Sequence, residues 1–202
     1  FLDFAVVGGS MVMENVHENS DFDVTVGCRG GRIFTVRAFL SIFFLIIGLK
    51  RSKNKTSPAA SDKFCFNHFV TQKSYCLSNS NHPYWIILYR RLVPIYGDNQ
   101  KIIEFFKTNS RWSGRSLVLF DKKYYPKRNN PVRLILEFIL SGPIGNLAES
   151  FFKKIQINSL QETKNKLNPA DSRFIINDSE LELHLSNKTI ESISKRLAQY
   201  EE

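Results

Sequence analysis

Cysteine is scarce in this sequence of 202 residues: Cys28, Cys65 and Cys76 are the only three, and they are widely spaced. An odd number at these spacings fits neither a CxxC metal knuckle nor a disulfide framework. The cysteines therefore imply no zinc site. We expect reduced and mostly buried thiols in a cytoplasmic protein.

Other common signals are also missing. The sequence has no internal repeat and no low-complexity tract, and its first residues, "FLDFAVV", lack the basic region and cleavage site of a signal peptide. They are typical of a strand already under way, which leaves room for a segment upstream of Phe1.

The sequence has one long apolar run, at residues 33–49, and Arg37 interrupts this run one helical turn after Ile33. This run is at the lower limit of what crosses a hydrocarbon core of about 30 Å. A buried helix fits it better than a membrane span, so we expect no stable membrane insertion. A membrane-attached protein anchored by residues 33–49 is the alternative.

The composition is otherwise that of a folded basic protein. With 43% hydrophobic residues the chain can bury a core, as one domain with an appendage or as two small domains. The formal net charge is +9, with the excess in loops such as "GLKRSKNK" and "DKKYYPKRNN". This favours a polyanionic partner, such as a nucleotide, a nucleic acid or a phosphate-rich surface, although such charge can also serve solubility alone.

Hydrophobic periodicity predicts an α/β (α+β) fold, with a mixed sheet flanked by helices. We expect a domain at residues 1–125 and a mainly helical C-terminal region at 126–202. Paired phenylalanines on two of the helices, Phe43 with Phe44 and Phe105 with Phe106, are expected in the core. The predicted strands are at residues 2–7, 21–26 and 64–70, and the predicted helices at 10–15, 33–49, 84–92 and 99–108.

Two carboxylates lie on one predicted strand. Asp21 and Asp23 flank Phe22, and residues two apart on a strand point to the same face, so both carboxylates converge near the end of the first strand. Adjacent carboxylates repel unless a cation lies between them, and hard oxygen ligands of this kind suit Mg²⁺. This pattern predicts a metal site for a triphosphate.

The turn after the first strand supplies the other half of such a site. Gly8 and Gly9 allow the backbone to approach a ligand closely. Ser10, at the expected start of a short helix, can donate to phosphate oxygens together with the amides there. Phosphate at the turn and metal at the aspartates are the two parts of a phosphoryl-transfer site.

These residues resemble a known family. The segment "GGS" followed by "DFDV" is similar to the signature of the DNA polymerase beta-type nucleotidyltransferase superfamily. "RIFTVRAFL", "SDKFCFNHFV" and "LVPIYGDNQKIIEFFKTNSRW" look like successive pieces of an uncharacterised prokaryotic nucleotidyltransferase-domain group. This looser likeness covers most of the chain, whereas the specific motif is confined to residues 1–26.

The resemblance implies that Ser10 and the backbone of Gly8 and Gly9 hold the triphosphate of an NTP such as ATP. Asp21 and Asp23 are then catalytic residues that bind Mg²⁺ or Mn²⁺ and align the NTP for attack by an acceptor hydroxyl. The resemblance leaves open whether this acceptor is a small molecule, a nucleic acid or a protein.

One position departs from the family pattern. Active members usually supply a third carboxylate from a later strand, whereas Asn67 occupies the matching place here and Asp62, just before the strand, is the nearest acid. The alternative function is therefore a catalytically degenerate module of the same fold, which binds a nucleotide, a nucleic acid or a protein partner.

Three further groups are weaker candidates: His17 with Glu14 and Glu18, Cys65 with His68, and Arg29 with Arg32. The first fits a polar loop better than a metal cluster. The second resembles a nucleophile pair but has no identifiable oxyanion group. The third fits a phosphate contact and a solvated turn equally well.

Overall fold

The computed structural model of the protein describes residues 1–12, 20–51, 63–77, 83–114, 125–126, 130–165 and 173–184. These residues form seven strands, five α-helices and one short 3-10 helix. In chain order they are β1 (Leu2–Gly8), β2 (Phe22–Cys28), α1 (Ile33–Ile46), β3 (Phe64–Thr71), η2 (Gln72–Ser74), α2 (Pro83–Arg90), β4 (Val93–Gly97), α3 (Asn99–Ser113), β5 (Tyr125–Pro126), α4 (Pro131–Ile139), α5 (Pro143–Asn165), β6 (Arg173–Ile176) and β7 (Glu180–His184).

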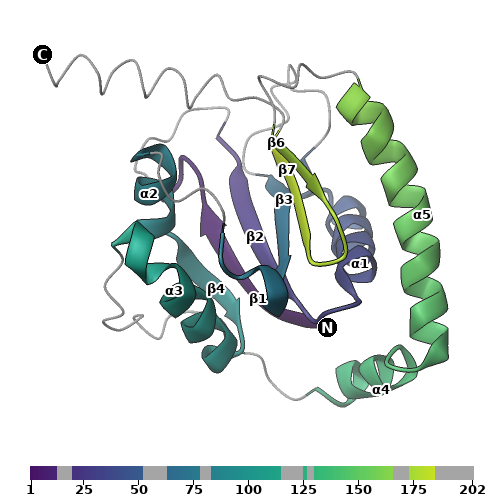
Figure 1. The fold of residues 1–202 in the computed structure, drawn as a ribbon. Coiled ribbons are helices and arrows are strands. Elements are labelled where there is room, and N and C mark those ends of the chain that lie inside the picture. The colour runs from purple at the N-terminus through teal and green to yellow at the C-terminus, as the bar shows by residue number, and fades with distance from the viewer. Residues whose placement is uncertain are drawn as a thin grey trace, which may run out of the picture.

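The strands form a single mixed sheet in the order β5-β4-β1-β2-β3-β7-β6. The neighbours β1 and β2 are antiparallel, whereas β2 and β3 are parallel and are joined through α1, because parallel neighbours require a crossover. Helices cover both faces of this sheet (Figure 1). The predicted fold class, a mixed sheet flanked by helices, is therefore confirmed.

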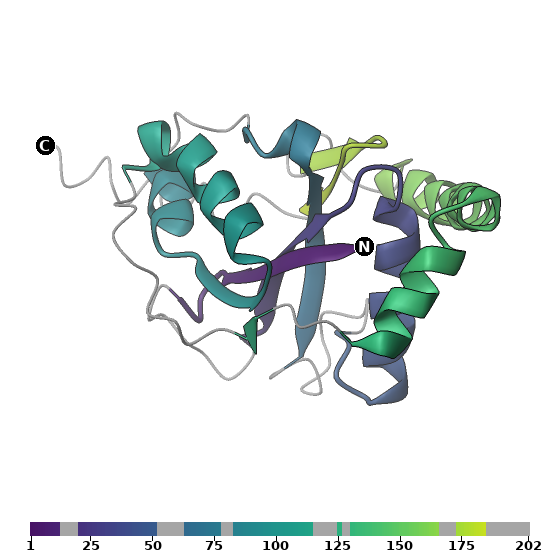
Figure 2. The same cartoon turned by 90° about the horizontal axis from the view of Figure 1, so that it is seen from below.

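Each face of the sheet carries its own apolar core. Phe4 and Val6 of β1 point toward α2 and α3, where they pack with Phe105 and Phe106. The alternate residues of β1, together with residues of α1, form the core on the opposite face. Figure 2 shows α2 and α3 on one side of the sheet and α1, α4 and α5 on the other. The prediction that Phe105 and Phe106 are core residues is confirmed.

The apolar helix at residues 33–49 is only partly buried. Its first turns, from Ile33 to Ala38, face the sheet, whereas Phe43 is 57% exposed, so the prediction of a core position for Phe43 is wrong. The neighbouring Phe44 is half-buried and faces β3, where its ring packs against those of Phe64 and Phe66, whereas Phe43 points away from this contact. The exposed large apolar side chains include Phe39, Ile42, Phe43, Leu45 and Ile46 of α1, Val132, Leu134, Ile135, Leu136, Phe138 and Ile139 of α4, and Ile144, Leu147, Phe151 and Ile155 of α5.

No single helix among the described residues has both the length and the apolarity to cross a membrane. The pair α4 and α5, bent by 81° at their junction, meets the criteria of length and composition together, and α1 is apolar but shorter.

Helix α5 fixes the position of α1 through polar contacts. The carboxylate of Glu149 accepts hydrogen bonds from the backbone N–H groups of Phe34, at 3.0 Å, and Thr35, at 2.8 Å. These amides belong to the first turn of α1, where a helix has no acceptors of its own. Arg37, which interrupts the apolar run, donates to Gln156 of α5 at 2.7 Å.

Four of the strands, β4 to β7, are not among those predicted from the sequence. The segment "VPIYG" forms β4 beside β1, where the sequence indicated only the end of a helix near Pro94. The hairpin of β6 and β7 extends the sheet beyond β3, so the C-terminal region contains strands as well as the helices α4 and α5. The predicted division of the chain into a domain at residues 1–125 and a C-terminal region at 126–202 stays a prediction.

Candidate metal and nucleotide site

The site lies at one end of the three central strands, where β1 ends and β2 and β3 begin. Gly8, the last residue of β1, is the register partner of Asp23 on β2, and Asp23 in turn pairs with Cys65 on β3. Because β2 is the middle strand of the three, its first residues are flanked on both sides by backbone. These three strands therefore hold the two aspartates and the glycine turn in fixed positions.

Asp21 and Asp23 project from the same face of the sheet, as their spacing predicts. Val24 and Val26, which alternate with them along the chain, are buried against α1, so the aspartates face the side of α2 and α3. One carboxylate oxygen of each lies within 4.8 Å of the other and of the Cys65 sulfur. Asp21 is only 8% exposed. The carboxylates therefore converge in a largely buried position.

The glycine turn lies directly against one of these carboxylates. Gly9 has a φ of +75°, a conformation that favours glycine, and a Cβ at this position would lie 2.4 Å from Oδ2 of Asp23. Such a distance is a steric clash, so only glycine allows this approach. Ser10 and the two residues after it form a turn, and the rest of the helix predicted at residues 10–15 lies outside the described residues.

Asn67 occupies the position expected for a third acid, and it contacts the aspartates. Its amide nitrogen donates to Oδ1 of Asp23 at 2.8 Å. Val24 pairs with Phe66 and Thr25 with His68, so Asn67 is the additional residue of a bulge in β3. Asp62, the alternative acid, lies outside the described residues, and among those described Cys65 is the third ligand-type group of the cluster.

Arg51 is a member of the site that sequence reasoning missed. After α1 the chain runs beside the start of β3, where the Arg51 backbone N–H donates to Phe64 at 3.1 Å. From there the Arg51 guanidinium forms an ion pair with Oδ2 of Asp21. A single arginine in a basic loop carries no signal of this contact, because it depends on how the loop returns to the sheet.

Burial and crowding shape the protonation of the cluster. Burial, and then the charge of Asp21, raise the pKa of Asp23 to about 7, while Arg51 and Asn67 oppose this effect. Burial and the two aspartates raise the pKa of Cys65 to about 12, so its thiol stays protonated at neutral pH. The two carboxylates, of which Asp23 has a pKa near neutral pH, provide hard oxygen ligands for a divalent cation such as Mg²⁺ or Mn²⁺.

Of the weaker candidates that the structure describes, Cys65 lies in this site, whereas His68 and Arg32 have partners elsewhere. With a protonated thiol, Cys65 is a poor nucleophile, and the His68 ring contacts Glu180 and Tyr89. Arg32 is 8% exposed and donates to the Leu140 carbonyl at 3.0 Å, so it has a structural role at the end of α4. The group of His17, Glu14 and Glu18 lies outside the described residues.

The expectation of mostly buried thiols is only partly met. Cys28 is buried and Cys65 is intermediate, whereas Cys76 is exposed. Cys76 follows η2 in a connecting segment.

Comparison with protein-family models, with curated proteins and with solved structures found no match to this chain.

Proposed function

We propose that this protein is a metal-dependent nucleotidyltransferase, which moves an NMP group from an NTP to the hydroxyl of an acceptor. One observation carries the proposal: the backbone at Gly9 and the carboxylate of Asp23 lie so close that no Cβ fits between them. A cation held by Asp21 and Asp23 would therefore lie beside the backbone of the turn. Phosphate oxygens can bind both at once in such an arrangement.

The chemistry requires little from the protein beyond positioning and neutralisation of charge. The acceptor oxygen attacks the α-phosphorus, the bond from this phosphorus to the bridging oxygen of the β-phosphate breaks, and pyrophosphate leaves. The hydroxyl proton passes to a base. Bound Mg²⁺ or Mn²⁺ would neutralise phosphate charge during this step. Asp21 and Asp23 would hold the cation, and the turn at Gly8, Gly9 and Ser10 would hold the phosphates.

Asn67 favours a second candidate function, which is nucleotide binding without transfer. Its neutral amide donates to Asp23, and an amide can neither accept the hydroxyl proton nor bind a second cation as a carboxylate does. Within the described residues, the cluster contains no third carboxylate. The same site would then bind the metal and the nucleotide, for recognition or regulation.

One experiment distinguishes the two functions. Nucleotide binding and pyrophosphate release are measured with each of the four ribonucleoside triphosphates and Mn²⁺. The proteins are the wild type, Asp21→Asn/Asp23→Asn and Asn67→Asp, and the acceptors are glycerol and RNA. Asp178→Asn, in the exposed turn between β6 and β7, serves as the matched control.

Release by the wild type and the control, lost in the double variant, supports the transferase. Binding without release in the wild type, together with release by Asn67→Asp, supports the binding module. Absence of both binding and release in all variants contradicts both functions.

A further inference from the structure

A second cluster of metal-ligand side chains lies on the same face of the sheet, away from the aspartates. His68 on β3 and Glu182 on β7 are register partners, and Glu180 is two residues before Glu182 on the same strand. One ligand atom of each residue lies within 4.8 Å of the other two. The glutamates on β7 lie two strands from Asp23 on β2, or roughly 10 Å, and His68 on β3 pairs with Thr25, two residues after Asp23.

Burial distinguishes this cluster from the acidic groups common on protein surfaces. His68 is 2% exposed and Glu182 is 1% exposed. The side chain of Glu180 is 14% exposed, which leaves the cluster one partly open side. Two carboxylates and an imidazole gathered at such depth are the oxygen and nitrogen ligands that a divalent transition-metal ion takes in proteins.

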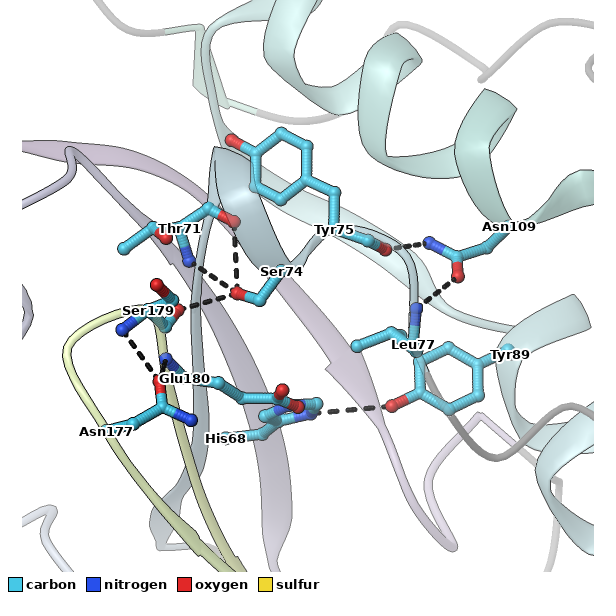
Figure 3. A network of polar contacts seen from close by, with 10 residues as sticks. All are labelled: His68, Thr71, Ser74, Tyr75, Leu77, Tyr89, Asn109, Asn177, Ser179 and Glu180. Carbon is cyan, nitrogen blue, oxygen red and sulfur yellow. Dashed lines mark hydrogen bonds and ion pairs between the residues drawn. The ribbon is translucent and has the colours of Figure 1, made fainter.

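The imidazole of His68 is oriented from both sides. Its Nε2 lies 3.0 Å from Oε1 of Glu180, and its Nδ1 lies 3.4 Å from the Tyr89 hydroxyl on α2 (Figure 3). Histidines that bind metals commonly have their second nitrogen held in this way, which directs the first toward the ion. Two ligands of a tetrahedral Zn²⁺ lie about 3.3 Å apart at normal bond lengths, close to the separation of Nε2 and Oε1 here.

The hairpin that carries both glutamates is also held in place. The side chain of Asn177 accepts hydrogen bonds from the backbone N–H groups of Ser179 and Glu180, each at 2.8 Å. The Ser74 hydroxyl, next to the end of β3, donates to the Ser179 carbonyl at 2.6 Å (Figure 3). The ligands therefore come from two strands whose relative position is fixed without the ion.

We propose that His68, Glu180 and Glu182 bind a divalent transition-metal ion, of which Zn²⁺ fits the nitrogen and carboxylate ligands, at a site separate from Asp21 and Asp23. Such an ion would link β7 to β3 and so fasten the C-terminal hairpin to the sheet. The ion would have a structural role, independent of the proposed nucleotide site.

Co²⁺ is a suitable probe, because its visible absorption reports ligand type and Zn²⁺ displaces it. We expect the apo protein to bind one equivalent of Co²⁺ at this cluster in competition with Zn²⁺, besides any cation held by Asp21 and Asp23, and the bound metal to raise the melting temperature. The Asp21→Asn/Asp23→Asn variant should bind this equivalent with unchanged affinity. His68→Gln and Glu182→Gln should weaken it at least tenfold.

If these two buried variants fail to fold, Glu180→Gln provides the test. Glu180 is partly exposed, and glutamine keeps a hydrogen-bond acceptor at this position. This variant should fold, bind Co²⁺ at least tenfold more weakly and lose the rise in melting temperature. Glu104→Gln, on α3, is the control. The proposal is overturned if the wild type binds no Co²⁺, if binding is lost in the Asp21→Asn/Asp23→Asn variant, or if folded Glu180→Gln binds Co²⁺ like the wild type.

Discussion

Asp23 has a pKa that its buried surroundings raise well above the ordinary value. Its folded-state pKa of about 7 lies above the usual value of 3.8, so below pH 7 the folded protein retains a proton that the unfolded chain releases. The free energy of unfolding of the metal-free protein should therefore fall as the pH rises from about 4 to about 7, and then level off.

Asp23→Asn removes this titration. The variant should lose that part of the pH dependence and, at pH 8 without metal, exceed the wild type in stability by about 1–2 kcal/mol, because a buried charge beside Asp21 is gone. Urea unfolding at several pH values, with EDTA present, measures both effects. Identical pH profiles for variant and wild type would contradict the assigned environment of Asp23.

Gly9 tests the closeness of the turn to the proposed metal ligands, Asp21 and Asp23. Gly9→Ala places a methyl carbon 2.4 Å from Oδ2 of Asp23 and forces a non-glycine residue into a positive φ. We expect a loss of about 1–2 kcal/mol in stability and the loss of Mn²⁺ binding. Gly30→Ala is the control for the added methyl group alone, because a Cβ there meets no atom within 4 Å. Equal Mn²⁺ affinity in Gly9→Ala and Gly30→Ala would show that the turn and the ligands are independent.

At the scale of the elements, α1 depends on a capping group from a distant helix. Glu149 accepts from the first-turn amides of α1, and its negative charge also suits the positive end of the helix dipole. Glu149→Gln should therefore lower the free energy of unfolding by about 1 kcal/mol. Glu162→Gln, exposed on the same helix, should change it little. Chemical denaturation measures both, and equal effects would exclude the capping role.

Elements that have a clear periodicity were predictable from the sequence. Strands β1, β2 and β3 and helix α3 occur within a few residues of their predicted ranges, because alternating or helical apolar patterns mark each of them. Strand β4 was missed because its five residues contain Pro94, which signals the end of an element. Nothing local marks such a strand, since its partner β1 is far away in the sequence.

In the candidate site, too, features set by local sequence were predictable, whereas contacts between distant segments were not. The convergence of Asp21 and Asp23 follows from the period of a strand, so it was predictable. The contact of Asn67 with Asp23 was not, because it depends on a bulge that exists only when β3 pairs with β2. The ion pair of Arg51 likewise requires the return of the chain to the sheet.

At the scale of the whole molecule, the C-terminal region contributes a strand and core residues to the sheet built by the N-terminal region. Leu181 of β7 is fully buried and pairs with Phe69 of β3, and Phe152 of α5 packs against the core beside α1. A protein that ends at residue 125 would expose this core and leave β3 at an open edge.

We therefore expect residues 1–125 alone to lack cooperative thermal unfolding and to aggregate, while the full chain unfolds cooperatively. Circular dichroism during heating, with light scattering, makes the comparison. A cooperative transition at the same temperature in both proteins would show that residues 1–125 fold independently.

The central claim is that Asp21, Asp23 and the glycine turn form one site for a metal and a nucleotide. Its most direct test is isothermal titration of ATP, with Mg²⁺ and with EDTA, into the wild type, Asp21→Asn/Asp23→Asn and the control Asp178→Asn. The account predicts Mg²⁺-dependent binding that the control retains and the double variant loses by at least tenfold. Binding that persists in EDTA, or that is equal in the wild type and the double variant, would contradict it.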